Sequence, residues 1–134
     1  MNEQKYDLEQ RLLEYSARII KVVEELPPTK VRNHIADQLL NCGTSPYPNH
    51  GEAQAAESVN DFIHKIGICL KELRESFRWL KLIKYIKLIK NTNRLDRLID
   101  ESEQLIKIFV KSKKTARSNK GSKLEVRRSM LDVK

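Results

Sequence analysis

The sequence predicts an all-α protein, an antiparallel up-down-up-down four-helix bundle over residues 1–112, followed by a basic tail over residues 113–134. Apolar residues recur every three or four positions in four separate segments. The connections between these segments are short and contain proline, glycine or helix-capping residues, which favours helices that alternate in direction. A chain of 134 residues is long enough to bury one core without disulfides or metals.

The first helix is expected over residues 7–26. Asp7 followed by Gln10 is a variant of the capping box. Pro27 and Pro28 end the helix, because proline lacks an amide donor and restricts the residue before it. The apolar face consists of Leu8, Leu12, Tyr15, Ile19, Val22 and Val23.

The second helix is expected to begin at Thr29, whose side chain suits an N-cap. Its apolar stripe consists of Val31, Ile35, Leu39 and Cys42. The segment that follows, residues 43–51, contains two prolines and two glycines. These residues should kink or break the helix, and the pattern leaves both alternatives open.

The third helix is expected from about Ser58, where Ser58 and Asp61 form another capping box. On a helical wheel, Lys84 and Lys87 fall on the apolar face of this helix. The helix should therefore end or reorient between Lys84 and Asn91. Its apolar face consists of Val59, Phe62, Ile63, Ile66, Cys69, Leu70, Leu73, Phe77 and Leu80.

The fourth helix is expected to begin near Asn93, with Asn93 as the cap and Asp96 as an acid of the first turn. Its apolar stripe consists of Leu95, Leu98, Ile99, Ser102, Leu105, Ile106 and Phe109. The apolar pattern stops after Lys111. Residues 113–134 are basic and poor in large apolar side chains, which predicts a tail that is disordered when free.

The positive charge is concentrated near the C-terminal end. The whole chain carries 26 Lys and Arg against 18 Asp and Glu, a net charge of +8. Nine of these basic residues and two of the acidic residues lie in residues 111–134, which therefore contribute +7, and residues 1–110 contribute +1. Such asymmetry points to a polyanionic partner, either nucleic acid or an anionic surface.

Two groups of cations are candidate nucleic-acid-binding residues. The first group, called here the α-helical stripe, consists of Lys71, Arg74, Arg78 and Lys81. The second group lies in the tail and consists of Lys113, Lys114, Arg117, Lys120, Lys123, Arg127 and Arg128. The stripe is spaced to follow a phosphate backbone along one helix face, with Tyr85 as a stacking surface. The alternative for the stripe is an ordinary solvated helix face, in which its cations pair with Glu72 and Glu75. The alternative for the tail is a segment that only keeps the protein soluble.

A second apolar face lies at the end of the third helix. It consists of Trp79, Leu82, Ile86 and Ile89. A bundle helix needs only one wide apolar face, so a second face implies another buried contact. We interpret these residues as an oligomer interface. The alternative is that neighbouring helices of the same chain cover both faces.

The histidines and cysteines form no recognised catalytic or metal-binding motif. We interpret His34, His50 and His64 as boundary or surface residues, and Cys42 and Cys69 as reduced core thiols. No phosphate-binding loop and no nucleophile elbow are present in the sequence. We therefore expect a protein that is not an enzyme and that needs no cofactor and no metal.

A cluster of acidic residues leaves one further alternative open. A hydrolase or nuclease would use Glu52, Asp61 and His64, which lie near one helix junction. The same acids are explained as helix-terminal residues. The sequence shows no signal peptide and no run of about 20 apolar residues, so we expect a cytoplasmic protein without a membrane partner.

Two segments resemble a known family. Residues 38–54, QLLNCGTSPYPNHGEAQ, resemble the Q-L-x-R-S-x-T-S-x-x-x-N-x-x-E-A motif of the bacterial four helix bundle protein family, also called 23S ribosomal RNA intervening-sequence proteins. Residues 56–80 resemble the family's E-S-x-x-D-F-I-x-K-L-x-I-A-L-K-E-x-x-E-x-x-x-W-L stretch. The resemblance covers about residues 6–112. Asn41 departs from it, because the family usually has a basic residue there, and so do His50 and Gly51.

The resemblance implies a four-helix bundle that assembles as a homopentamer around a central channel. It also implies a distant relation to the accessory variability proteins of diversity-generating retroelements, which work with a reverse transcriptase and RNA. It implies no enzyme activity. The motif positions, to which the resemblance gives a structural role at a kinked junction and a cap, are Gly43, Thr44, Ser45, Asn49, Glu52, Ser58 and Asp61.

These observations leave two main hypotheses of function. The first is a non-enzymatic, homo-oligomeric accessory protein that binds RNA or DNA electrostatically and largely independently of sequence. The second is an oligomeric protein-interaction scaffold without a nucleic-acid role. The charge asymmetry favours the first hypothesis, and the second apolar face favours the second.

Overall fold

The computed structural model describes the backbone of residues 3–132 and the side chains of residues 7–121. This part of the chain is all-helical and contains no strand, which confirms the predicted fold class. The helices are α1 (Glu3–Glu25), α2 (Lys30–Thr44), α3 (Pro46–Gln54), α4 (Val59–Tyr85) and α5 (Asn93–Asp132).

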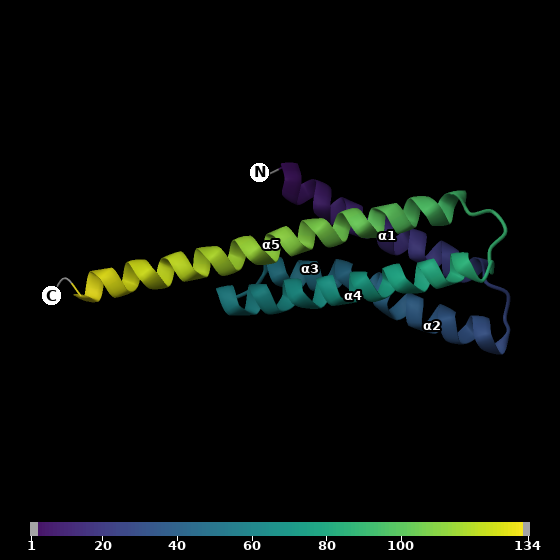
Figure 1. Ribbon diagram of the computed structural model, residues 1–134, viewed down its shortest axis with the longest axis horizontal. Helices are drawn as coiled ribbons and strands as arrows, with labels where there is room; N and C mark the ends of the chain where they lie inside the picture. The colour runs from purple at the N-terminus through teal and green to yellow at the C-terminus, as the bar shows by residue number, and fades with distance from the viewer. Residues whose placement is uncertain (1–2, 133–134) are drawn as a thin grey trace.

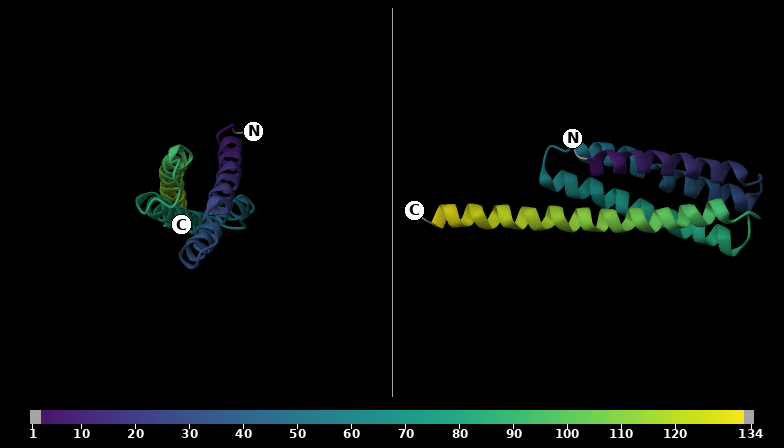
Figure 2. Two further views of the ribbon diagram at one scale, coloured as in Figure 1. Left: turned by 90° about the vertical axis from the view of Figure 1, so that its right-hand side faces the viewer. Right: turned by 90° about the horizontal axis from the view of Figure 1, so that it is seen from above.

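The helices form an antiparallel bundle in which α2 and α3 together take the place of one helix (Figure 1). Consecutive rods run in opposite directions along the long axis. Helix α1 packs against α2, α3 and α5, and helix α4 packs against the same three helices from the other side. The end-on view shows the rods grouped around one axis (Figure 2). The up-down-up-down order follows from the short connections.

Two of the four predicted caps are present, and Asp7 and Asn93 are not caps; Asn93 is the first residue of α5, so the cap position belongs to Thr92. The Thr29 hydroxyl accepts a hydrogen bond from the backbone N–H of Arg32, and the Ser58 hydroxyl accepts one from the N–H of Asp61 at 3.0 Å. Asp7 is not a cap, because α1 begins four residues earlier, at Glu3. The sequence of the first turn is as polar as that of a loop, so the apolar pattern gave no sign of this extension.

The segment after the second predicted helix breaks it into α2 and α3. Pro46 and Pro48 lack the amide hydrogens that would bond to the carbonyls four residues earlier. The single residue between the helices, Ser45, keeps helical backbone angles of φ −69° and ψ −35°. The Asn49 side chain bonds to the Ser45 carbonyl at 3.0 Å and to its hydroxyl at 2.9 Å. The chain therefore bends here without leaving the bundle.

Helix α4 ends inside the predicted interval, through a Schellman motif. The N–H of Leu88 bonds to the carbonyl of Ile83, and the N–H of Lys87 bonds to the carbonyl of Lys84, each at 3.2 Å. Lys87 lies in the left-handed region, with φ 58°. This turn keeps Lys87 off the apolar face, as the helical wheel required.

The tail differs from its prediction. Helix α5 continues from Asn93 to Asp132 without a break near Ser112, and its last turns project beyond the other helices (Figure 1). The loss of apolar periodicity after Lys111 marks where α5 leaves the core, and the helix itself continues. Lysine, arginine and alanine are good helix formers, and the segment contains no proline.

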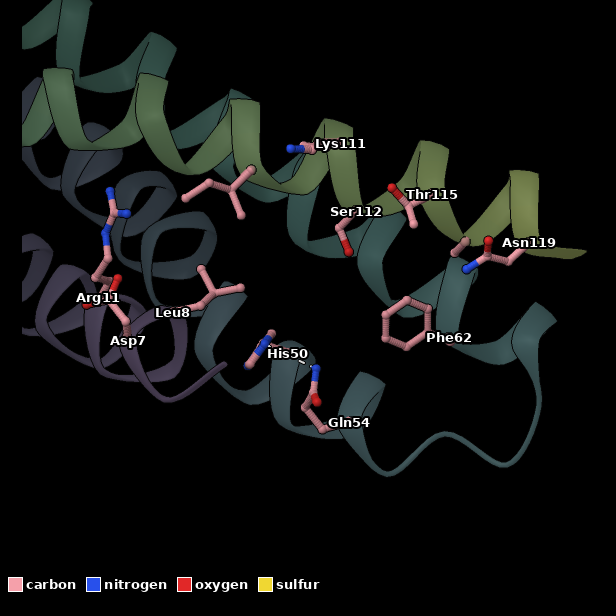
Figure 3. Close-up of a pocket in the computed structure, with 12 residues that line it drawn as sticks. Asp7, Leu8, Arg11, His50, Gln54, Phe62, Lys111, Ser112, Thr115 and Asn119 are labelled. Carbon is pink, nitrogen blue, oxygen red and sulfur yellow. Dashed lines mark hydrogen bonds between the residues drawn. The ribbon is translucent and has the colours of Figure 1, made fainter. Parts of the chain in front are cut away.

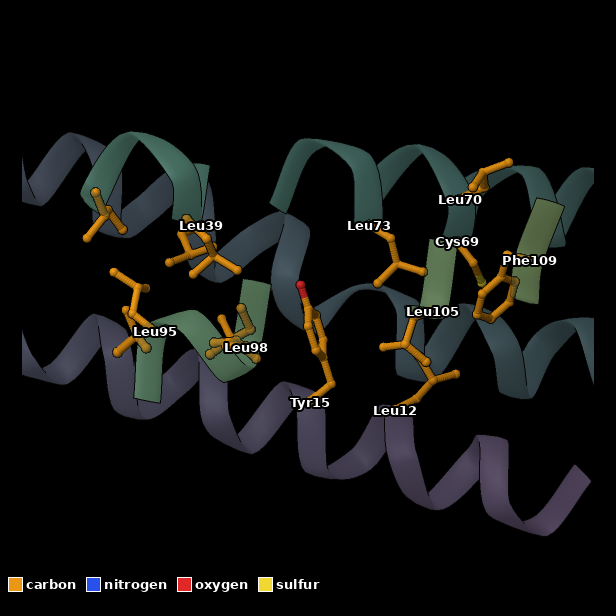
Figure 4. Close-up of a cluster of buried hydrophobic side chains, with 14 of the residues drawn as sticks. Leu12, Tyr15, Leu39, Cys69, Leu70, Leu73, Leu95, Leu98, Leu105 and Phe109 are labelled. Carbon is orange, nitrogen blue, oxygen red and sulfur yellow. The ribbon is translucent and has the colours of Figure 1, made fainter. Parts of the chain in front are cut away.

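The core follows the predicted apolar faces, with a polar centre (Figure 4). The hydroxyl of Tyr15 lies 2.6 Å from Ser76 Oγ and 2.7 Å from Ser102 Oγ, and Ser102 Oγ donates to the carbonyl of Leu98. Burial raises the pKa of Tyr15 to about 12. Two predicted core positions are wrong, because Val31 in the first turn of α2 is 61% exposed and Val59 in the first turn of α4 is 36% exposed. The fully buried large residues are Leu12, Tyr15, Ile19, Leu39, Ile66, Leu73, Leu80, Ile83, Leu95, Leu98, Leu105 and Phe109.

Candidate nucleic-acid interface

A basic groove lies between the first half of α4 and the part of α5 that follows the core. Its volume is about 620 Å³. It brings Lys71 of the α-helical stripe together with Lys113 and Arg117 of the predicted tail, and none of its lining residues is acidic. The residues that line this basic groove are Asn60, Ile63, His64, Gly67, Ile68, Lys71, Lys113 and Arg117.

A glycine makes room for one of these cations. A Cβ atom added at Gly67 would lie 3.3 Å from Lys113 Nζ, so the ammonium group occupies the space that a side chain would take. Two turns further on, Lys120 bonds to the side-chain oxygen of Asn60. These contacts hold the start of the α5 extension against α4 and fix the antiparallel register of the two helices.

The charge of α5 changes sign along its length. Residues 104–121 contain six basic residues and no acidic residue. Nearer the α4–α5 turn, residues 93–103 of α5 contain four acidic residues (Asp96, Asp100, Glu101 and Glu103) and two basic residues (Arg94 and Arg97), a net charge of −2. Asp96 pairs with Lys84 of α4 at 2.7 Å, and this hydrogen bond lowers the pKa of Asp96. The potential is therefore most positive beside the basic groove.

The other stripe residues lie outside the basic groove. Arg74, Arg78 and Lys81 are exposed on α4, between the basic groove and the α4–α5 turn. The register set by Lys120 and Asn60 places this section of α4 beside the acidic section of α5. Lys81 also lies over the ring of Phe77, 5.2 Å from its centroid. The structure therefore places one residue of the predicted stripe, Lys71, in the basic groove and the other three outside it.

The remaining tail cations are only partly described. Lys114 is exposed on α5, and Lys120 makes the hydrogen bond to Asn60 given above. Lys123, Arg127 and Arg128 belong to the helical backbone of α5, but their side chains lie outside the described residues.

A second hollow, called here the bundle-end hollow, lies on the other side of α5, between α1, α3, α4 and α5 (Figure 3). Its volume is about 830 Å³. A smaller adjoining hollow shares Gln54, Phe62, Ala116 and Asn119 with it. The lining residues of the bundle-end hollow are Asp7, Leu8, Arg11, His50, Gln54, Phe62, Ile108, Lys111, Ser112, Thr115, Ala116 and Asn119.

The surface assignment of His50 is wrong. His50 is 2% exposed and meets the ring of Phe109 edge-on, with 6.1 Å between the ring centroids. The Gln54 side-chain nitrogen lies 3.3 Å from His50 Nε2. The break between α2 and α3 turns this residue inward, which the residue pattern around two prolines did not predict. His34 and His64 are exposed.

Most of the second apolar face is covered by the chain itself. Trp79 is partly buried and lies edge-on to His34 of α2, with ring centroids 6.0 Å apart. Ile89 is also partly buried against the core. Leu82 and Ile86 are 38% and 42% exposed. Only these two of the four residues therefore present much apolar surface to a partner.

The motif residues make structural contacts. Gly43 is buried against Ile19, and the hydroxyl of Thr44 donates to the carbonyl of Leu40 at 2.6 Å. Glu52 forms an ion pair with Lys65 at 2.8 Å, which raises the pKa of Lys65.

The groups that could do chemistry are engaged elsewhere or kept apart. Glu52 faces Lys65, whereas His64 lines the basic groove. Burial raises the pKa of both cysteine thiols to about 12. Within the described residues, no three of the His, Cys, Asp and Glu side chains are grouped to hold a metal ion. In that same part of the chain, every helix is too short or too polar to cross a membrane.

Sequence reasoning missed the groove residues on α4. Neither Asn60 nor Gly67 is among the predicted binding residues, and His64 is among them only in the hydrolase alternative, because the α5 residues opposite them belong to a segment predicted to be disordered.

Comparisons with known proteins agree with this fold. A family model described as 23S rRNA-intervening sequence protein matches residues 4–111. A solved structure of a protein with unknown function from the S23 ribosomal protein family of Bacteroides thetaiotaomicron is similar, with a TM-score of 0.73 and 29% identity. The match covers 80% of this chain and 98% of that chain. No curated protein matches.

Proposed function

The chain belongs to the 23S rRNA-intervening sequence protein family, and we propose that it is a non-enzymatic, homo-oligomeric accessory protein of the cytoplasm that binds RNA or DNA. The observation that carries this proposal is the basic groove, which is lined by Lys71, Lys113 and Arg117 and by no acidic residue. Binding is electrostatic and largely independent of sequence.

The charges of the basic groove suit a phosphate backbone. Each cation that meets a phosphate releases condensed counterions, and this release supplies most of non-specific affinity. Contacts to phosphates position a protein on nucleic acid but do not read its bases. The exposed cations Lys107, Lys111 and Lys114 extend the positive surface around α5. A backbone that enters the basic groove would therefore meet further positive charge on α5.

The section of α4 beyond the basic groove is a weaker candidate. Arg74, Arg78 and Lys81 lie beside the section of α5 in which four acids outnumber two cations, and this net negative charge repels phosphates. Isolated exposed cations on a helix are also common on ordinary protein surfaces. We assign the phosphate contacts to the basic groove and the α5 extension.

Fluorescence anisotropy with labelled RNA and duplex DNA over a salt series tests the proposal. Five or more phosphate contacts would give a slope of log affinity against log salt of about −4.5 or steeper on duplex DNA. Absence of binding to both probes at 50 mM salt would refute the nucleic-acid function.

We propose that the homo-oligomer is a pentamer, the assembly that the family resemblance implies. Its support is the exposed apolar surface of Leu82 and Ile86. Native mass spectrometry of the wild type should show pentamers, and Leu82→Asp with Ile86→Asp should show monomers. Trp79 is a poorer probe, because its substitution would disturb the contact with His34 inside the chain. A monomeric wild type at micromolar concentration would contradict the oligomer.

The second candidate function is a protein-interaction scaffold. It is favoured by the α4 end, where Tyr85 is 85% exposed next to Leu82 and Ile86. Clustered exposed aromatic and aliphatic residues are typical of protein interfaces. By the distant resemblance to accessory variability proteins, a reverse transcriptase is the partner class to test. The scaffold would be favoured if the wild type pulled down a reverse transcriptase, the Tyr85→Ala variant did not, and the wild type bound no nucleic acid.

A further inference from the structure

We propose that the bundle-end hollow binds one unstacked base of a single-stranded nucleic acid, so that the protein prefers single strands to duplexes. This inference rests on the nucleic-acid function proposed above and adds the strandedness of the ligand. The basic groove on one side of α5 takes phosphates, and the bundle-end hollow on the other side takes a base.

An aromatic ring is available in the bundle-end hollow. Phe62 lines both the bundle-end hollow and its smaller neighbour, and it is packed against the core (Figure 3). It lies in the first turn of α4, which the Ser58 cap holds in place. Bases stack on exposed aromatic faces in single-strand-binding proteins, and each such contact contributes roughly 5- to 150-fold in affinity. Leu8, Ile108 and Ala116 add apolar lining.

Amide side chains accompany the ring. Gln54 of α3 and Asn119 of α5 line both hollows together with Phe62. An amide offers a donor and an acceptor side by side, the arrangement that pairs with the edge of a base. The contact of Gln54 with buried His50 sets the position of its amide before any ligand binds. Ser112 and Thr115 add hydroxyls from α5.

The charges that line the bundle-end hollow come close to balancing, which suits a neutral base: Asp7 offsets the charge of Lys111, and Glu101 pairs with Arg11. Arg11 is engaged by Glu101 through two nitrogens, at 2.6 and 3.2 Å, and Asp7 lies nearby. The basic groove, by contrast, has three lining cations and no acidic lining residue. The two hollows are separated by the thickness of α5, about 10 Å for a helix. Lys114 is exposed on α5, and at 100° per residue it falls between Lys113 and Arg117 of the basic groove and Lys111 of the bundle-end hollow. A strand that crosses α5 from one hollow to the other therefore meets a cation.

The test uses three probes of equal length and phosphate number per strand: single-stranded DNA, the corresponding duplex, and single-stranded DNA with abasic central positions. The full-length protein is measured by anisotropy at several salt concentrations. Wild type should bind the complete single strand at least 5-fold more tightly than the abasic strand. Equal affinity for these two strands would overturn the inference, while binding to them would leave the proposed function standing. Absence of binding to all three probes would instead defeat the proposed function.

A pair of matched variants locates the base. Phe62→Leu keeps apolar volume but removes the aromatic face, and Phe77→Leu makes the same change on α4 outside both hollows. Phe62→Leu should weaken binding to the single strand at least 5-fold at every salt concentration, without changing the salt slope or the affinity for the duplex. Phe77→Leu should leave single-strand affinity within 2-fold of wild type. Equal effects of the two changes would overturn the inference.

A third variant separates loss of base binding from loss of folding. Asn119 is exposed on α5, so Asn119→Ala should leave the thermal unfolding curve unchanged and weaken single-strand binding at least 3-fold. The bundle-end hollow could instead hold a segment of a second copy of the chain. In that case Phe62→Leu would abolish self-association and leave the affinity for the single strand unchanged. That result would also overturn the inference.

Discussion

Replacing Gly43 by alanine should destabilise the bundle, because α1 and α2 approach each other too closely at this point for a side chain. A Cβ atom at Gly43 would lie 2.6 Å from Cγ2, 2.8 Å from Cγ1 and 2.9 Å from Cδ1 of Ile19. Carbon atoms pack best at about 3.5–4.0 Å. Ile19 would therefore have to move by about 1 Å.

Ile19 has little freedom to move. It is fully buried and β-branched, and β-branched side chains have one strongly preferred rotamer in a helix. Overpacking a core costs about 1–3 kcal/mol. Alanine gains about 1 kcal/mol over glycine inside a helix, so this gain hides part of the steric cost in a single variant.

Gly51→Ala is the matched control, because a Cβ atom at Gly51 meets no atom within 4 Å. It should stabilise the protein by about 0.5–1 kcal/mol through the helix preference alone. Since that gain is common to both variants, the difference between them isolates the clash. Urea unfolding followed by circular dichroism at one protein concentration should give Gly43→Ala a free energy of unfolding about 1–3 kcal/mol below that of Gly51→Ala. Equal stability of the two variants would refute the packing argument.

Three further predictions concern the core and the α4–α5 turn. Tyr15→Phe should lower the free energy of unfolding by about 1–3 kcal/mol, since it removes the hydroxyl shared by two buried serines; an unchanged urea midpoint would contradict this role. Lys87→Gly should raise the free energy of unfolding by about 0.5–1 kcal/mol, because glycine adopts the left-handed backbone of the Schellman motif without strain, and a loss of stability would count against that motif. Cys42 and Cys69 should react with Ellman's reagent only after urea is added, because both thiols are buried and protonated; rapid labelling of the native protein would show that the core opens.

Local sequence signals predicted the helices well. A hydroxyl or amide cap needs only its own neighbours, so the caps at Thr29 and Ser58 could be read directly. Lys84 and Lys87 on an apolar face likewise required the helix to end there. Periodicity identifies which face of a helix is buried, and the core confirms those faces for most positions.

Contacts between helices were harder to predict. Periodicity does not say which helices are neighbours or in what register, so the serines bonded to Tyr15 and the glycine beneath Lys113 could not be found. The inward turn of His50 depends on how α3 continues after Ser45. The apolar pattern also reports burial and not helicity, which is why it predicts a disordered tail where α5 continues as a helix.

The most direct test of the central claim compares two triple variants that remove the same charge. The first removes cations of the basic groove (Lys71→Gln, Lys113→Gln and Arg117→Gln), and the second removes stripe cations outside it (Arg74→Gln, Arg78→Gln and Lys81→Gln). On duplex DNA, the groove variant should make the salt slope shallower by about 2.7, at about 0.9 for each lost phosphate contact, and the stripe variant should change it by less than about 1. Equal changes, or a larger change in the stripe variant, would contradict the assignment of phosphate binding to the basic groove.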